Sequence, residues 1–172
     1  MQTFKLTFYT LFFASLLMTS CKNNKKETLS YKDVQIMAEG PLFEGSNTIQ
    51  GDLVTQLPAL TQKLKIDTED IVSIRLNSVN LSIDDTSNFN LFSSITLQFA
   101  SEKTDMIEVA LINPVPVDKQ TIQLTVASEQ ENLLDLLKQD KFTIVADAIL
   151  KEDSDKNINM KAHLDFELTY KK

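Results

Sequence analysis

The chain has 172 residues, with 24 acidic and 17 basic side chains that give it a net charge of −7. The acidic balance argues against the basic face that nucleic acids require. Arg75 is the only arginine, so the chain has no set of guanidinium groups for binding phosphate. The chain has no Trp and only one His and one Cys, which leaves few side chains for stacking on sugars or for nucleophilic catalysis.

The N-terminal segment has the organisation of a signal peptide. Residues 1–5 carry one positive charge, and Leu6 to Met18 is an apolar run that is interrupted only by Thr and Ser. A helix needs about 20 apolar residues to cross the hydrocarbon core of a bilayer, so this run is short for a permanent span. The polar residues 22–27 that follow do not extend it. We therefore expect residues 1–20 to be a cleaved signal peptide.

The pentapeptide Leu17-Met18-Thr19-Ser20-Cys21 ends this apolar run and contains the only cysteine of the chain. It resembles the lipobox of bacterial lipoproteins, with Met18 where Leu is usual. The resemblance implies that the Cys21 thiol receives a diacylglycerol, that the chain is cleaved before Cys21, and that the new amine is acylated. Lipidation would consume the only thiol of the mature chain. The alternatives are an uncleaved anchor and an ordinary secretory signal with a bystander cysteine.

We expect residues 21–30 to be the lipidated cysteine and a flexible tether, because the residues before Leu29 are polar and rich in lysine. In some bacteria an Asp directly after the cysteine retains a lipoprotein at the inner membrane, and in others a run of acids there marks export to the cell surface. This chain has Lys22 and Asn23 in those places. The resemblance therefore implies a lipid anchor in the bacterial cell envelope, at the outer membrane and facing the periplasm.

Alternation of apolar and polar residues dominates residues 31–172, which we expect to form a single domain. The clearest strand is the last, where every second residue from Ile158 to Tyr170 is apolar. The nearly continuous apolar run 142–150 predicts a central strand that is covered on both faces. Two shorter apolar faces have alternating residues: Ile107, Val109 and Leu111 in one, and Ile122, Leu124 and Val126 in the other.

Residues 70–83 contain a change of parity. Val72, Ile74 and Leu76 share one parity, whereas Val79, Leu81 and Ile83 share the other. One extra residue near Asn77 and Ser78 would restore a common face, so we predict a β-bulge there. The alternative is two strands with a tight turn, for which Asn-Ser is a poor sequence.

Two helices are expected between the strands. Ser128 and Glu131 match a capping box, and a leucine-rich stripe that ends near Asp140 follows them. The other predicted helix has leucines at a helical spacing, namely Leu53, Leu57, Leu60 and Leu64. Pro58 lies inside this pattern, so the helix either starts or kinks there. We interpret both stripes as surfaces that face the core.

The connections at 84–90, 101–105 and 153–157 use Asp, Asn and Ser in place of Gly. Together these elements predict an all-β, mainly antiparallel fold: a β-sandwich of about seven strands with one or two short helices. The Cys…Trp…Cys spacing of true immunoglobulin domains is missing, and residues 31–172 resemble no specific family.

Few residues are candidates for chemistry. The motif Asp153-x-Asp155-x-Asn157 resembles the start of an EF-hand loop, but Ile158 and Leu164 stand where Gly and Glu are required. We interpret the oxygen-rich segment 84–90 as a solvated turn. His163 stands alone on the polar side of the last strand, and no Gly-x-Ser-x-Gly elbow accompanies it. We therefore expect no catalytic residue, no metal ligand and no cofactor.

These observations favour an envelope lipoprotein, anchored in the membrane through Cys21, whose domain is a non-catalytic interaction or structural module. Its expected partner is another envelope protein, bound through strand edges or the loops 84–90 and 153–157, and no nucleic acid is expected. The alternative is a carrier or chaperone for an apolar ligand such as a lipid, which needs a cavity between sheets or beneath a helix. A hydrolase that uses carboxylates is a third hypothesis, and no motif of the sequence supports it.

Overall fold

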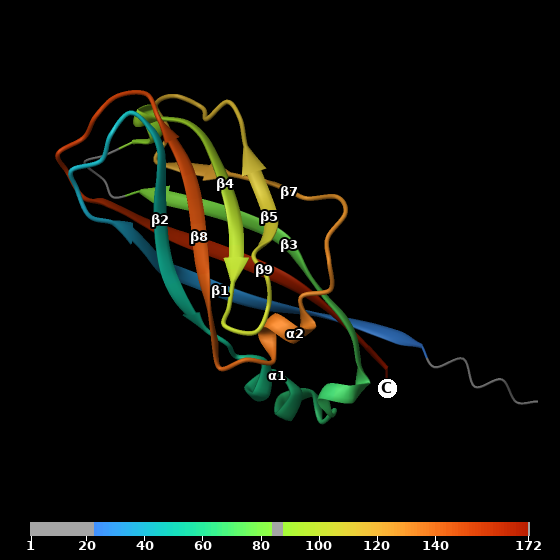
Figure 1. Cartoon of the computed structure of the whole chain (residues 1–172). Coiled ribbons are helices and arrows are strands. Elements are labelled where there is room, and N and C mark those ends of the chain that lie inside the picture. The colour runs from blue at the N-terminus through green and yellow to red at the C-terminus, as the bar shows by residue number, and fades with distance from the viewer. Residues whose placement is uncertain (1–22, 84–87, 172) are drawn as a thin grey trace, which may run out of the picture.

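The computed structural model describes residues 23–83 and 88–171, and within these ranges the chain forms nine strands and two α-helices (Figure 1). The strands are β1 (Asn24–Ala38), β2 (Gly45–Val54), β3 (Ile71–Ile83), β4 (Phe92–Ala100), β5 (Ile107–Ile112), β6 (Thr121–Gln123), β7 (Thr125–Val126), β8 (Lys141–Leu150) and β9 (Ile158–Lys171). The helices are α1 (Leu57–Leu64) and α2 (Leu134–Leu137), and the short 3-10 helices are η1 (Thr68–Asp70) and η2 (Phe89–Leu91). The predicted all-β class is confirmed.

The strands of the described residues form one antiparallel sheet in the order β6-β3-β9-β1-β2-β8-β4-β5-β7. Leu124 alone separates β6 from β7, and its N–H donates to the carbonyl of Val79 in β3 at 3.1 Å. Because β6 pairs with β3 and β7 pairs with β5, this segment brings the two ends of the sheet together. The sheet is therefore nearly closed.

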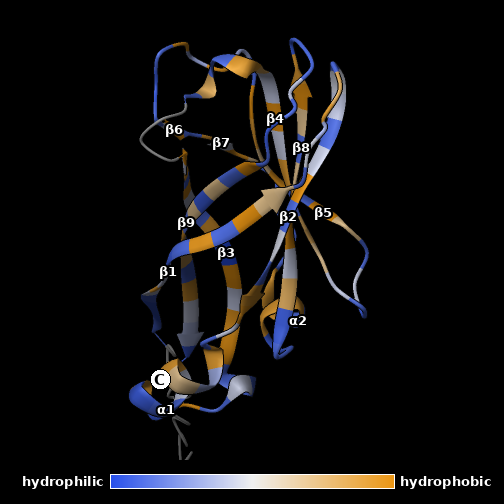
Figure 2. Cartoon of the chain, turned by 90° about the vertical axis from the view of Figure 1, so that its left-hand side faces the viewer, coloured by the Kyte–Doolittle hydropathy of each residue, from blue (hydrophilic) through white to orange (hydrophobic). Residues whose placement is uncertain are grey.

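The sheet divides into two halves between β1 and β2. These strands pair at Met37 and Gln50 and at no other position that the structure describes. In Figure 1, β2, β8 and β4 run across β1, β9 and β3, and Figure 2 shows the two groups from the side. The core lies between the halves, because buried apolar side chains of both groups belong to one cluster.

Aromatic rings join the two halves. The ring centroid of Phe99 in β4 lies 5.0 Å from that of Phe142 in β8 and 5.9 Å from that of Phe166 in β9. Phe166 in turn makes an edge-to-face contact with Tyr31 of β1 at 5.7 Å. Pairs of this kind contribute about 0.5–1.5 kcal/mol each beyond the burial of their area. The cluster therefore helps to hold the two halves face to face.

The alternation of the last strand is confirmed. Every second residue from Ile158 to Tyr170 is at most 6% exposed, and the residues between them lie on the outer face. β9 pairs with β1 along one edge and with β3 along the other. A strand of this length is stable because both of its edges have long partners.

The predicted bulge of β3 is also confirmed. The register between β3 and β9 shifts between Leu76 and Ser78, which leaves Asn77 as the extra residue. Val79 and Leu81 beyond it are fully buried. A second shift between Ile71 and Ser73 was not predicted, and it leaves Val72 40% exposed.

The expectation of a flexible tether over 22–30 is wrong for residues 24–30, which belong to β1. Asn24 pairs with Lys171, and the pairing with β9 continues without a shift to Tyr31. The side chains of this part of β1 are mostly polar. β9 nevertheless forms hydrogen bonds with the backbone of these residues, whatever their side chains are. The ordered domain therefore starts no later than Asn24, before the predicted boundary at residue 31.

The helix expected around Pro58 is α1, and Pro58 lies in its first turn as predicted for a start. Leu57 and Leu60 are buried, whereas Leu64 is half-buried. Leu53 is not part of this helix, because it is a buried residue of β2.

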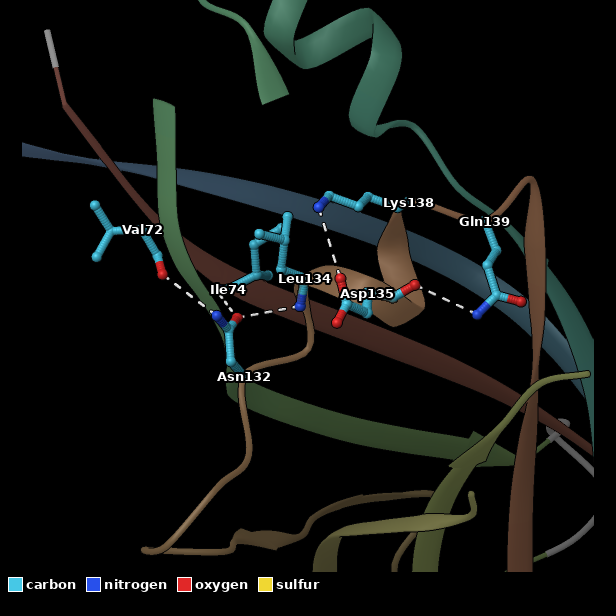
Figure 3. Close-up of polar contacts among 7 residues, drawn as sticks. All are labelled: Val72, Ile74, Asn132, Leu134, Asp135, Lys138 and Gln139. Carbon is cyan, nitrogen blue, oxygen red and sulfur yellow. Dashed lines mark hydrogen bonds and ion pairs between the residues drawn. The ribbon is translucent and has the colours of Figure 1, made fainter. Parts of the chain in front are cut away.

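The predicted capping box of Ser128 and Glu131 is wrong, since α2 is a single turn that starts at Leu134. The residues before α2 are held by the edge of β3 instead. Asn132 Oδ1 accepts from the N–H of Ile74 at 3.0 Å and from that of Leu134 at 3.1 Å, as Figure 3 shows. The bond to Ile74 is tertiary and the bond to Leu134 is local, and together they take the place of the predicted capping box.

Two further strand expectations are corrected in part. β8 is a central strand between β2 and β4, as predicted, but its outer face is not fully covered, because Ile149 is 41% exposed. In β5 Val109 is buried, whereas Leu111 is 44% exposed. A register shift between Leu97 and Gln98 of β4 accounts for the change of face along β5.

Candidate functional site

Four loops meet at the end of the sheet that is drawn at the top of Figure 1. They are residues 39–44, 88–91, 113–120 and 151–157, which we call the loop cap. The cap unites the described parts of the two loops that the sequence predicts for docking, and it adds two loops that the sequence does not single out. Residues 84–87 of the first predicted loop lie outside the described residues.

Hydrogen bonds tie one side of the loop cap together. The side chain of Asn90 donates to Asp118 Oδ1 at 2.8 Å, and its Oδ1 accepts from the N–H of Asp118 at 2.6 Å. Lys151 reaches the same loop, because its Nζ donates to the carbonyl of Asn90 at 3.0 Å and its N–H donates to that of Leu91 at 2.9 Å. Residues 88–91 therefore connect the loop before β6 to the loop before β9.

The other side of the cap joins the loops before β2 and β9. Leu42 and Ser154 exchange two backbone hydrogen bonds of 2.8 Å. Asp153 Oδ1 accepts from the N–H of Glu44 at 2.7 Å, and Asn157 Oδ1 accepts from that of Gly40 at 2.9 Å. Asp153 and Asn157 of the EF-hand-like motif thus bind backbone amides of the loop before β2. The described residues include no group of three or more His, Cys, Asp or Glu side chains placed to hold a metal ion.

Two large apolar side chains of the loop cap face solvent. Phe43 is 65% exposed and Val117 is 61% exposed. The four loops contain six carboxylates and three lysines, so the cap is acidic. Hydrogen bonds fix the backbone beside both side chains, so each is presented to solvent from an ordered loop. Neither residue was predicted to be part of the site, although each lies in a proline-containing turn where no strand could bury it.

A groove of about 550 Å³ opens beside the cap, where β1 leaves β2. Met37, Glu39 and Leu42 line one side, and Thr48, Gln50 and Asp52 of β2 line the other. Its volume lies within the range of small-ligand sites, but about half of its lining is polar. Gly51 shapes the groove, since a Cβ at this position would overlap the carbonyl oxygen of Gln35 where β1 crosses β2.

An ion pair marks the far end of this groove. Lys141 Nζ donates to Asp52 Oδ2 at 2.7 Å, and Thr143 Oγ1 donates to Asp52 Oδ1 at 2.9 Å. The hydrogen bond from Lys141, followed by that from Thr143, lowers the pKa of Asp52, and the same carboxylate raises the pKa of Lys141. Both side chains are largely exposed, so solvent screens the pair. It orders the surface of the groove and supplies no reactive group.

His163 lies in a polar cluster on the outer face of β9. Its Nε2 is 3.5 Å from Asp165 Oδ1, and Asp165 also accepts hydrogen bonds from Ser30 at 2.6 Å and Ser78 at 2.8 Å. The hydrogen bond from Ser30 is the main reason that the pKa of Asp165 is lowered. Both serines donate to the carboxylate and neither donates to the imidazole, so the cluster lacks the nucleophile-to-base hydrogen bond of a hydrolytic triad.

Cys21, the candidate lipidation site, lies outside the described residues. None of the helices within the described residues is long and apolar enough to cross a membrane.

Comparison with known proteins gives little guidance. No protein-family model and no curated protein matches this chain. A solved structure of Desmodium yellow mottle tymovirus is similar at 12% sequence identity and a TM-score of 0.29, over 100% of this chain and 97% of that one.

Proposed function

We propose that this chain is a lipoprotein of the bacterial cell envelope, anchored through Cys21 at the outer membrane and facing the periplasm, whose domain docks another envelope protein. The observation that carries the docking role is the loop cap, in which hydrogen bonds fix four loops around the exposed side chains of Phe43 and Val117. Exposed apolar side chains among polar neighbours can be buried by a protein partner, and their burial stabilises the complex. Because the cap is acidic, its partner presents basic and apolar side chains.

We further propose that the nearly closed sheet is a β-sandwich. Its two groups of strands cross each other face to face, with the apolar core between them (Figure 2). The pairing of β1 with β2 at Met37 and the segment around Leu124 join the two layers at their edges.

Docking is favoured over the alternative of an apolar-ligand carrier. The rings of Tyr31, Phe99, Phe142 and Phe166 pack between the two layers, where a carrier would hold its ligand. The groove beside the cap is open and half polar, which suits a peptide or a loop of a protein better than an acyl chain. The Asp165 cluster supports a non-catalytic role, because it supplies no activated nucleophile.

Anchoring is tested with labelled fatty acid in cells. The wild-type protein takes up the label, and Cys21→Ala abolishes both the labelling and the cleavage before this residue. Labelling that survives in the Cys21→Ala protein contradicts the lipid anchor at this site.

Docking is tested by crosslinking in intact cells and identification of the captured proteins. The double variant Phe43→Ser/Val117→Ser should lose a partner that the wild type captures. Val54→Ser is the matched control, because Val54 is 70% exposed but lies at the end of β2 away from the cap. A partner that is lost equally with the control variant, or retained by the double variant, contradicts docking through the cap. Recovery of a bound lipid alone favours the carrier.

A further inference from the structure

The end of the domain opposite the loop cap contains the start of β1. Asn24 pairs with Lys171 of β9, and Tyr170 pairs with Ile71, which directly follows η1. The start of β1 also lies near α1, where Lys63 Nζ is 3.9 Å from Glu27 Oε1. Figure 1 shows the C-terminus beside α1 and η1 at this end. We call residues 24–27, 57–70 and 167–171 the anchor pole.

We propose that the anchor pole lies against the lipid bilayer and that the loop cap points away from it. This inference rests on the proposed lipidation of Cys21. Three peptide links join Cys21 to Asn24, and they span at most about 11 Å. The polar interface of a bilayer is about 5–8 Å thick on each side. A lipid on Cys21 therefore leaves at most about 3–6 Å of chain between the membrane surface and the first paired residue of the sheet.

The distribution of charge fits this orientation. The anchor pole contains five lysines and five carboxylates, so its charges balance. The remainder of the mature chain has eleven basic and nineteen acidic residues. An anionic lipid surface therefore repels the remainder of the chain and does not repel the anchor pole. The acidic loop cap is thereby held at the far end of β9, whose 14 residues extend on the order of 40 Å.

The partner of the loop cap therefore approaches from the aqueous side. It does not have to lie in the plane of the membrane to which the domain is anchored. A soluble envelope protein, or a part of one that extends toward this membrane, meets this requirement.

The orientation is tested with the full lipidated protein in vesicles of phosphatidylethanolamine and phosphatidylglycerol. A single thiol is introduced by Gln62→Cys on α1 or, as the matched variant on the cap, by Glu152→Cys; both positions are exposed. A fluorophore on the thiol is then quenched by nitroxide-labelled lipid headgroups. Strong quenching at position 62 and little at position 152 is the expected result, and Lys171→Cys should behave like position 62.

Quenching at position 152 that equals or exceeds that at position 62 overturns the orientation. The wild-type protein separates this failure from a failure of the anchor. Its only cysteine is consumed if Cys21 is lipidated, so it should bind the vesicles and take up no fluorophore. A wild-type protein that reacts with the fluorophore and stays in solution contradicts the lipid anchor itself.

Discussion

The side-chain amide of Gln130 pairs with the backbone of Leu76 as a residue of a neighbouring strand would. The N–H of Leu76 donates to Gln130 Oε1 at 2.8 Å, and Gln130 Nε2 donates to the carbonyl of Leu76 at 2.8 Å. Asn132 acts in the same way on Ile74 and Val72 (Figure 3). β6 pairs with β3 at residues 80–82 only. These two amides, with the backbone N–H groups of Leu124 and Leu133, cover the part of the β3 edge that β6 does not reach. An uncovered edge is a template for pairing with other chains.

The double variant Gln130→Ala/Asn132→Ala should uncover this edge. Several half-buried hydrogen bonds would be lost at about 1 kcal/mol each, so we expect the free energy of unfolding to fall by about 2–4 kcal/mol. Urea unfolding measures this loss, and light scattering should show self-association that the wild type lacks. Glu131→Ala, an exposed residue between the two, should stay within about 0.5 kcal/mol of the wild type. An unchanged stability and a monomeric double variant would contradict the role of the amides.

The acid stability of the domain should depend on Asp165. Hydrogen bonds from Ser30 and Ser78 lower the pKa of Asp165 in the folded state. The carboxylate is therefore stabilising above its unfolded-state pKa of about 3.9, and this contribution is lost as the pH falls through the lower folded-state value. Asp165→Asn should flatten the fall of the free energy of unfolding below about pH 4. Urea unfolding at a series of pH values tests this, and parallel curves for wild type and variant would refute it.

Gly51 should be sensitive to the addition of a single methyl group. A Cβ at this position would meet the backbone of Gln35 and Ile36, which belongs to the crossing strand β1 and has no flexible end to move aside. We expect Gly51→Ala to destabilise the domain by about 2–4 kcal/mol in urea unfolding, or to prevent folding. Gln50→Ala changes an exposed neighbour on β2 and should cost less than about 0.5 kcal/mol. Equal effects of the two substitutions would mean that the strands can separate at this crossing.

The parts of the fold that could be predicted are those where the pattern of apolar and polar side chains follows the pattern of burial. One face of β9 packs on the core along its whole length, so its sequence alternates, and the bulge at Asn77 appears as a change of parity. The first residues of β1 show no such alternation, because they pair at the end of the sheet where both faces are exposed to water. Their structure depends on the backbone of β9, a partner more than a hundred residues away.

The candidate site was predictable only in part, for a related reason. Polarity and turn-forming residues identified the loop 153–157, but Asp153 and Asn157 hold other loops in place, and it is Phe43 and Val117 that face solvent. A large apolar residue in a turn is usually assumed to fold back on the core. Whether it does depends on the loops around it, and the sequence does not show which loops meet.

Removal of residues before Leu29 tests where the domain begins. A chain that starts at Leu29 lacks the five pairs from Asn24 to Thr28, together with the 2.8 Å ion pair between Lys26 and Glu167. In this shortened chain the end of β9 has no pairing strand on the side of β1. A chain that starts at Asn23 should fold with a predominantly β circular-dichroism spectrum and serves as the control. The chain that starts at Leu29 should be less stable by about 2.5–5 kcal/mol in urea unfolding, at about 0.5–1 kcal/mol for each lost pair of backbone groups. The exposed ion pair adds little to this difference. If the two chains unfold at the same urea concentration with the same slope, residues 24–28 contribute nothing to the domain, and the spacer between the lipid and the sheet would be longer than the pairing indicates.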